Sequence, residues 1–458
     1  MIIRMNELPS KAYIVAVDMG YGHMRAAYPL LDISATPLSW NIREPYIISA
    51  NTYPGIPKKD QKLWQSGRGI YEWISRMREL PFLGERLFAA MNYFQRIDHF
   101  YPKRDQSKTM FQLDYIYKLI HKKGFGKHLI HELNKNPLPL ITTFFTPAFC
   151  AEEHGYKGPI YCLCTDTDIS RAWVPQHPKN SRIIYFAPSH RVCERLKAYG
   201  VPEEKIITTG FPLPKELVGK SMKDLDLIKS VTHRRIIRLD PTGKFRKKFQ
   251  TLVSETLGRD IHGSTSEPVS IAFAIGGANA QFQIGLDVIE SLAPDIKNGK
   301  FRLNLIAGVS NKIYGIFEKA LKDHGLDLYR GKGVDIIYNP DKVTYFAEFD
   351  EVLLDTDILW TKPSELAFYA GLGLPILIAP TLGSQEEYNQ DWLHVVGAGI
   401  GQGNPRYTRE WLSDWLESGI LSEMALNGYL NVSKKGAYHI EAAVLRGEHS
   451  EMQDIHLV

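Results

Sequence analysis

The sequence predicts an α/β protein with two Rossmann-like, doubly wound domains that face each other across a cleft. Short apolar runs bounded by turn residues alternate with longer amphipathic segments along most of the 458 residues, which is the pattern of successive βαβ units. Several of these runs are uniformly apolar, as expected for parallel strands that helices cover on both faces. At roughly 100–200 residues per domain, the length fits two or three such units.

The candidate strands fall into two groups. Those of the first half are 12–18, 139–145, 159–166, 182–189 and 205–210, and those of the second half are 268–277, 301–308, 334–339, 356–361 and 374–380. Between them we expect a connector with helical pieces, opened by Pro212 and Pro214. Ligands bind such sheets beyond the carboxyl ends of the strands, so functional residues are expected in the loops that follow the strands.

The composition excludes several kinds of protein. Lys and Arg number 55 against 51 acidic residues, a net charge of +4 that is too dilute to indicate a nucleic-acid partner. The four cysteines have no CxxC spacing, so we expect neither a disulfide framework nor a metal site. No apolar run reaches the ~18–20 residues of a membrane span, which predicts a cytoplasmic protein, at most peripheral on the inner face of the membrane.

A glycine-containing loop follows the first candidate strand. Gly20 and Gly22 permit a tight turn, and His23 stands where the next helix is expected to begin, which disfavours protonation of its imidazole. A neutral imidazole is a usable general base. Arg25 occupies the sixth position of the loop, where a dinucleotide fingerprint has Gly or Ala, and this disfavours a nicotinamide cofactor. The structural alternative is that His23 only caps or packs the turn.

This loop, GYGHMRAA (20–27), resembles the GxGHxxAA loop of monogalactosyldiacylglycerol synthases. More distantly it is similar to the GGTGGH loop of the lipid-linked N-acetylglucosaminyltransferase of peptidoglycan synthesis. Both are GT-B glycosyltransferases in which the histidine lies beside the acceptor hydroxyl. The resemblance therefore implies that His23 is catalytic and that Gly20 and Gly22 belong to the acceptor-side loop.

Three further segments of the first half are similar to the same families: 139–149, 162–175 and 185–214. The second of them, CLCTDTDISRAWVP, resembles a "TD…W" loop over the cleft, which implies that Asp166 and Asp168 lie near the acceptor. Asp166 is the second candidate for the base, or for a group that orients it. The alternative is that these carboxylates cap a helix or fix the loop by hydrogen bonds.

Two segments of the second half resemble the family's donor site. The first, FAIGGANAQFQIGLDVIESL (273–292), is similar to a "GGxGxQ" loop whose last position is Gln281. Gly276 and Gly277 are expected to end a strand and open a helix, where free N–H groups hold a phosphate.

The second donor segment, 355–399, is the most specific of these similarities. Lys362 adds a positive charge, Ser364 is expected to cap a helix while backbone donors meet a diphosphate, and Glu365 is a candidate for the ribose hydroxyls. Here Pro363 and Ser364 replace the longer glycine-rich stretch of the family. A "GxQExN" stretch follows, and its candidates for donor binding and sugar hydroxyls are Gly383, Gln385, Glu386 and Asn389.

Two basic segments interrupt the pattern. Residues 100–131 hold seven Lys or Arg against two Asp among interleaved aromatic residues, and residues 233–250 hold seven against one Asp. An apolar face beside a basic edge suits the surface of an anionic membrane. The alternative is an ordinary solvated face; no nucleic-acid-binding module accompanies either segment, so no nucleic-acid partner is expected.

The resemblance implies a domain plan and a reaction. We expect an acceptor domain at 1–214 with a basic, aromatic insert at about 55–135, a connector at 215–267, a donor domain at 268–405, and C-terminal helices at 406–458 that pack back on the first domain. The implied reaction is inverting transfer of a hexose from a UDP-sugar substrate to an acceptor hydroxyl, on a lipid, without a metal or other cofactor. Two alternatives stay open: a UDP-sugar epimerase of the same architecture, and a non-catalytic nucleotide-sugar-binding protein.

Overall fold

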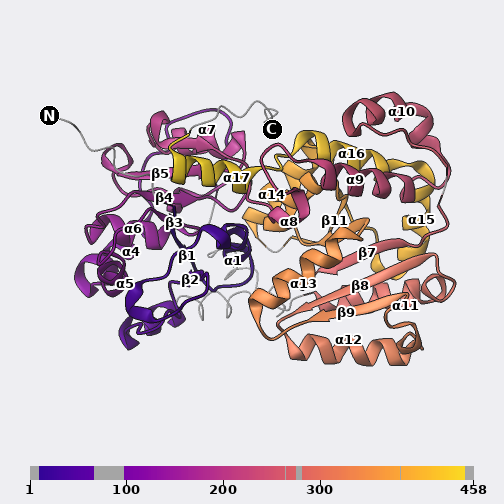
Figure 1. The fold of residues 1–458 in the computed structure, drawn as a ribbon, viewed down its shortest axis with the longest axis horizontal. Coiled ribbons are helices and arrows are strands. Elements are labelled where there is room, and N and C mark those ends of the chain that lie inside the picture. The colour runs from indigo at the N-terminus through magenta and orange to yellow at the C-terminus, as the bar shows by residue number, and fades with distance from the viewer. Residues whose placement is uncertain (1–9, 67–96, 264, 275–280, 382, 449–458) are drawn as a thin grey trace. The chain divides into compact units, whose positions relative to one another are not determined.

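The computed structural model describes residues 10–66, 97–263, 265–274, 281–381 and 383–448. They form two compact units (Figure 1). The first contains described residues up to Pro212, together with 383–388 and the segment that begins at Lys435; the second contains described residues from Leu213 to Thr381 and from Asn389 to Lys434. Each unit is built around one six-stranded sheet.

The sheet of the first unit has the order β2-β1-β3-β4-β5-β6, with every described pairing parallel. Its strands are β1 (Tyr13–Ala16), β2 (Ile48–Ser49), β3 (Leu140–Thr142), β4 (Ile160–Leu163), β5 (Ile183–Ala187) and β6 (Ile206–Thr208). The chain runs from β1 to β2 on one side and then returns to place β3 on the other side of β1. The topological switch point, where ligands bind in such sheets, is therefore between β1 and β3.

Helices of the first unit connect these strands. They are α1 (Gly22–Ala27), α4 (Phe111–Lys123), α5 (Lys127–Leu133), α6 (Phe145–Glu153), α7 (His190–Ala198) and α17 (Gly436–Glu441). The four cysteines are free and buried. Cys162 and Cys164 belong to the core of this unit together with Trp173 and Tyr185, as expected for small apolar side chains that alternate along a buried strand.

The sheet of the second unit has the order β12-β11-β10-β7-β8-β9, again with parallel pairings. Its strands are β7 (Val269–Ala274), β8 (Phe301–Gly308), β9 (Val334–Tyr338), β10 (Ile358–Thr361), β11 (Ile376–Ile378) and β12 (Gly399–Gly401). Numbered from β7, this is the 3-2-1-4-5-6 order of a Rossmann sheet, with its switch point between β7 and β10. The expectation of two Rossmann-like, doubly wound domains is confirmed.

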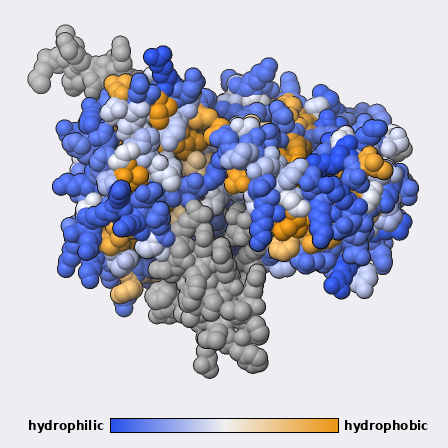
Figure 2. Space-filling model, turned by 90° about the horizontal axis from the view of Figure 1, so that it is seen from below, coloured by the Kyte–Doolittle hydropathy of each residue, from blue (hydrophilic) through white to orange (hydrophobic). Residues whose placement is uncertain are grey.

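Helices flank this second sheet in Figure 1. They are α8 (Lys215–Val218), α9 (Asp226–Arg238), α10 (Lys244–Leu257), α11 (Phe282–Lys297), α12 (Asn311–Asp323), α13 (Lys342–Leu354), α15 (Thr408–Ser418), α16 (Ile420–Asn431) and the part of α14 (Ser384–Val395) from Asn389. Helices α8 to α10, in the segment expected to be a connector, belong to the second unit, and α9 and α10 pack against α16. None of the helices in the described part of the chain is long and apolar enough to cross a bilayer, and the face in Figure 2 carries its apolar residues in small, separate groups.

Arginines of α9 anchor that helix to the end of α13 and the start of β10. Arg235 is buried and donates to the carbonyl oxygens of Thr356 (2.7 Å) and Leu372 (2.6 Å). Arg238 lies 3.5 Å from the carboxylate of Asp357. Burial raises the pKa of Asp357 from its ordinary value of 3.8 to about 6, although Arg238 and the N–H of Ser270 oppose the shift.

This shift predicts a pH dependence of stability. The folded protein keeps a proton on Asp357 up to about pH 6 and the unfolded chain releases it near pH 4, so this group makes the free energy of unfolding fall as the pH rises between those values. The full change is about 3 kcal/mol, at about 1.4 kcal/mol per pKa unit. Denaturant unfolding of the wild type and of Asp357→Asn at a series of pH values measures it. The free energy of unfolding of the wild type minus that of Asp357→Asn is expected to fall between about pH 4 and pH 6 and then to stay constant. A difference that does not depend on pH would contradict the prediction.

Candidate functional site

The switch point of each unit carries a candidate residue that the sequence predicted. In the first unit, His23 follows β1 and Thr143 follows β3. In the second unit, Lys362 directly follows β10, and Gln281 precedes α11, the first described helix after β7. Each switch point is therefore the centre of one candidate site.

The imidazole of His23 has a defined orientation. His23 is the second residue of α1 and is half-buried. Its Nδ1 lies 2.8 Å from the carbonyl oxygen of Thr143. Because a carbonyl oxygen only accepts, we assign the proton of the neutral ring to Nδ1, which leaves the basic lone pair on Nε2. In its neutral form, a His23 ring held in this way has the tautomer that a general base acting through Nε2 requires.

Aromatic rings enclose one side of this histidine. The ring of Phe144 meets the imidazole edge-on, with centroids 4.8 Å apart, and the ring of Trp173 lies at 6.3 Å. Phe144 also packs on Phe145 at 4.2 Å, and both phenylalanines are half-buried. Gly20, three residues before His23, has a φ of +99°, a conformation that favours glycine. The base candidate therefore follows a glycine turn and packs against aromatic rings.

The two aspartates of the "TD…W" loop have different surroundings. Asp168 is buried, and its two carboxylate oxygens accept from Nε (2.8 Å) and Nη2 (2.7 Å) of Arg195, which is also buried. Arg195 donates in addition to Gln106 at 2.8 Å. Asp166 is half-buried. The bonding of Asp168 is that of a residue that fixes the loop, the alternative that the sequence had left open.

The loop after β10 carries the candidates of the second unit. Lys362 and Ser364 are half-buried and Glu365 is buried. The expected capping by Ser364 is wrong: residues Glu365–Leu372 form a 3-10 helix, and the Ser364 side chain makes no capping hydrogen bond. The first turn is closed instead by the Ser364 carbonyl, which accepts from the N–H of Ala367 at 2.9 Å.

Asn389 lies beneath this loop. It is fully buried, and its side-chain amide donates to the carbonyl oxygen of Pro363 at 3.2 Å. Its place in the structure is thus a support for the turn that carries Lys362 and Ser364. Hydrogen bonds to buried groups of this kind fix the geometry of the residues above them.

The remaining donor-side candidates lie at two helix starts. Gln281 precedes α11, has a φ of +69°, and donates from its side chain to the carbonyl of Pro380 at 2.6 Å. Gly276 and Gly277 lie outside the described residues. The Gly383 carbonyl accepts from the N–H of Glu386 at 3.0 Å in the first turn of α14, where Gln385 and Glu386 are half-buried.

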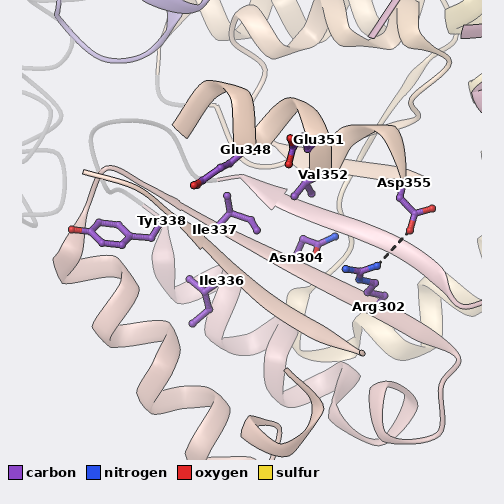
Figure 3. Close-up of a pocket in the computed structure, with 9 residues that line it drawn as sticks. All are labelled: Arg302, Asn304, Ile336, Ile337, Tyr338, Glu348, Glu351, Val352 and Asp355. Atoms are coloured by element: carbon purple, nitrogen blue, oxygen red, sulfur yellow. Dashed lines mark hydrogen bonds and ion pairs between the residues drawn. The ribbon is translucent and has the colours of Figure 1, made fainter. Parts of the chain in front are cut away.

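A pocket of about 360 Å³ lies away from these candidates, between α13 and strands β8 and β9 (Figure 3). Its lining consists of Arg302, Asn304, Ile336, Ile337, Tyr338, Glu348, Glu351, Val352 and Asp355. Arg302 crosses the pocket toward Asp355, with Nη1 3.4 Å from the carboxylate. None of the residues predicted from the sequence lines it, so it is separate from both switch points.

Reasoning from the sequence missed the residues that support the candidates, above all Thr143, Thr165 and Arg195. The hydroxyl of Thr165 lies 3.4 Å from Nδ1 of His23. The available signal was positional: Thr143 and Thr165 each fall near the carboxyl end of a predicted strand, at the edge of the sheet where His23 was expected.

No protein-family model and no curated protein sequence matches the chain. Among solved structures it is similar to MurG of Acinetobacter baumannii (11% identity, 95% of this chain and 99% of the other, TM-score 0.45). It is also similar to MnaA of S. aureus in complex with UDP (11%, 94% and 95%, 0.44). A third similar structure is the UDP-GlcNAc 2-epimerase of Methanocaldococcus jannaschii with UDP-GlcNAc and UDP (13%, 94% and 98%, 0.40). At these identities and scores, a function has to rest on the residues of the chain itself.

Proposed function

We propose that the protein is a glycosyltransferase that transfers a hexose from a nucleotide-sugar, a UDP-sugar, to a hydroxyl group of a lipid acceptor. The first unit binds the acceptor and the second binds the donor. One observation carries the proposal: each sheet places its chemically suited residues at its own switch point, with His23 bonded to Thr143 in one and Lys362 to Glu365 following β10 in the other. These are the positions at which doubly wound sheets bind ligands.

On the acceptor side, Nε2 of His23 takes the proton of the reacting hydroxyl. The hydroxyl oxygen forms a bond to the anomeric carbon from the face opposite the diphosphate. The bond between that carbon and the diphosphate oxygen breaks, the electron pair leaves with the nucleoside diphosphate, and the anomeric centre is inverted. Asp166 is the second candidate for the base, or for a group that orients it, and the half-buried Phe144 offers the acceptor an apolar face.

On the donor side, the side chains have separate tasks. Lys362 supplies a positive charge to the diphosphate, Ser364 supplies its hydroxyl and backbone N–H, and Glu365 accepts from ribose hydroxyls. Asn389 positions this turn through the Pro363 carbonyl. Gln385 and Glu386, which belong to the first unit, remain the candidates for the sugar hydroxyls.

A lipid acceptor requires access to a membrane, and α4 offers a suitable surface. Phe111 and Tyr115 are 73% and 53% exposed, and Lys118 and Lys122, which follow them on the same face, are exposed as well. Aromatic residues followed by lysines suit the interface of an anionic bilayer. We therefore include the surface of an anionic membrane among the proposed partners.

Binding of the donor is tested first by thermal stabilisation with nucleoside diphosphates and nucleotide-sugars. A ligand at 100 times its dissociation constant adds about 2.7 kcal/mol to the folded state, so UDP or a UDP-sugar is expected to raise the melting temperature. Lys362→Ala is expected to weaken binding of UDP about 10- to 150-fold, since a charge-assisted hydrogen bond contributes about 1.5–3 kcal/mol. The matched control is Lys322→Ala, an exposed lysine of α12. Equal affinities of Lys362→Ala and the wild type would remove Lys362 from the donor site.

The alternatives differ in what happens to the bound sugar. The proposed transferase releases UDP only when an acceptor is present. An epimerase converts the UDP-sugar with no acceptor, and a non-catalytic binding protein releases no UDP with any acceptor. Product analysis of UDP-sugar mixtures with and without glycolipid precursors separates the three.

A further inference from the structure

We propose that Thr143 and Thr165 are positioning residues that hold His23 with its proton on Nδ1 and its lone pair on Nε2. The inference deepens the proposed function, since it concerns the same base, and it rests on contacts within the first unit. Both threonines lie in segments that resemble the family, but the sequence singled out neither as a site residue. Neither is placed to touch the acceptor, because Thr143 is fully buried and Thr165 is 3% exposed.

Thr143 contacts His23 at two points. Its carbonyl oxygen accepts from Nδ1 at 2.8 Å, and its hydroxyl donates to the main-chain carbonyl oxygen of His23 at 2.9 Å. The N–H of Thr143 donates to the carbonyl of Val15 in β1 at 3.0 Å. Thr143 is therefore fixed to the strand that leads into the His23 loop, and it holds both the ring and the backbone of the histidine.

Thr165 places a second oxygen near the same nitrogen. Its hydroxyl oxygen lies 3.4 Å from Nδ1. Because Nδ1 already donates to a carbonyl, the Thr165 oxygen faces it as an acceptor and not as a donor. Two oxygens at Nδ1 favour the tautomer with the proton there, and both interactions strengthen when the ring becomes positively charged after taking the acceptor proton.

The ring is also restrained from the side. The edge-on contact with Phe144 at 4.8 Å limits rotation about the Cβ–Cγ bond, which would exchange the positions of the two nitrogens. The contacts of Thr143 and Thr165 with Nδ1 and the packing of Phe144 on the ring thus leave Nε2 as the nitrogen that faces the acceptor. This is the orienting task that a third group performs for a catalytic histidine.

Pairs of variants at each position separate the hydroxyl from the shape of the side chain. Thr143→Val and Thr165→Val keep the branched shape and lose the hydroxyl, whereas Thr143→Ser and Thr165→Ser keep the hydroxyl. We expect Thr143→Val to lower kcat about 10-fold, the equivalent of one lost hydrogen bond, with KM for the nucleotide-sugar unchanged. Thr143→Ser is expected to stay within about 3-fold of the wild type. Equal losses in the valine and serine variants would overturn the positioning role of the hydroxyl.

A measurement without turnover keeps this inference distinct from the proposed function. Long-range ¹H–¹⁵N correlation spectra report which imidazole nitrogen carries the proton, and His23→Gln identifies the His23 signals among the 15 histidines. We expect the proton on Nδ1 in the wild type and also in both valine variants, because the main-chain carbonyl of Thr143 remains as its acceptor. The Nδ1–H signal is expected to shift in Thr165→Val, which loses one of the two oxygens near Nδ1. A proton on Nε2 in the wild type would overturn the inference even in an active enzyme. A proton on Nδ1 in a protein without transferase activity would support the positioning role of the two threonines and contradict the proposed glycosyltransferase activity.

Discussion

Replacing His23 with alanine is expected to lower kcat of the transferase about 10²–10⁴-fold, the usual contribution of a general base. The loss follows from the position of Nε2, which carries the lone pair while Nδ1 donates to Thr143. Binding of the nucleotide should persist, because the proposed donor residues Lys362 to Glu365 belong to the second unit. A steady-state assay with the nucleotide-sugar and a lipid acceptor, combined with calorimetric titration of UDP, measures both quantities.

The matched control for this substitution is His177→Ala. His177 belongs to the same unit but is exposed, next to the short 3-10 helix Pro178–Asn180, and its removal should leave kcat unchanged. If His23→Ala retained the activity of the wild type, the base would have to be another group. Asp166 would then be tested next by Asp166→Asn, which keeps the shape of the side chain and removes its charge.

The strands could be predicted where the apolar runs are long. β8 spans Phe301–Gly308, the range that the apolar run predicted, and β7 is buried at all of its positions. β2 and β12 were missed. β2 contains only Ile48 and Ser49, and β12 is the glycine-containing Gly399–Gly401, so neither is long or apolar enough to produce a periodic pattern. Both are edge strands, which exist because a neighbouring strand pairs with them.

The candidate site could be predicted only in its local part. His23 follows from the glycines and the strand before it, which are adjacent in the sequence. Its contact with Thr143 depends on the pairing of β1 with β3, in which Val15 lies beside Thr142, and that pairing joins segments far apart in the chain. At Ser364 the local sequence was misleading. Serine is a favoured helix cap, but the Ser364 side chain makes no capping hydrogen bond and the 3-10 turn is closed by its carbonyl.

The pairing of Asp168 with Arg195 could not be predicted from the local sequence pattern either. Arg195 is on α7 and looks in the sequence like one of several basic residues of an exposed helix face, yet its side chain is fully buried. Removing one member of such a buried pair is expected to be severe, because it leaves the other charge buried without its counter-ion. We expect Asp168→Ala to lower the free energy of unfolding by about 3–5 kcal/mol.

Denaturant unfolding followed by tryptophan fluorescence measures this loss, because Trp173 is buried at the end of the same loop. The control is Lys103→Ala, which breaks the Lys103–Glu194 pair. That pair has a similar N–O distance of 3.0 Å, but the lysine side chain is 63% exposed, so its loss should cost less than about 1 kcal/mol.

A double variant distinguishes the buried charge from the role of the loop. Asp168→Leu combined with Arg195→Met removes both charges, and replacing a buried pair with apolar residues is often neutral in stability. If the double variant regains stability but turns over slowly, the pair also shapes the acceptor side, because the loop it fixes carries Thr165, whose hydroxyl lies 3.4 Å from Nδ1 of His23. If Asp168→Ala unfolds no more easily than Lys103→Ala, the carboxylate does not neutralise Arg195 in solution. Asp168 would then return to the candidates for a direct part in the reaction.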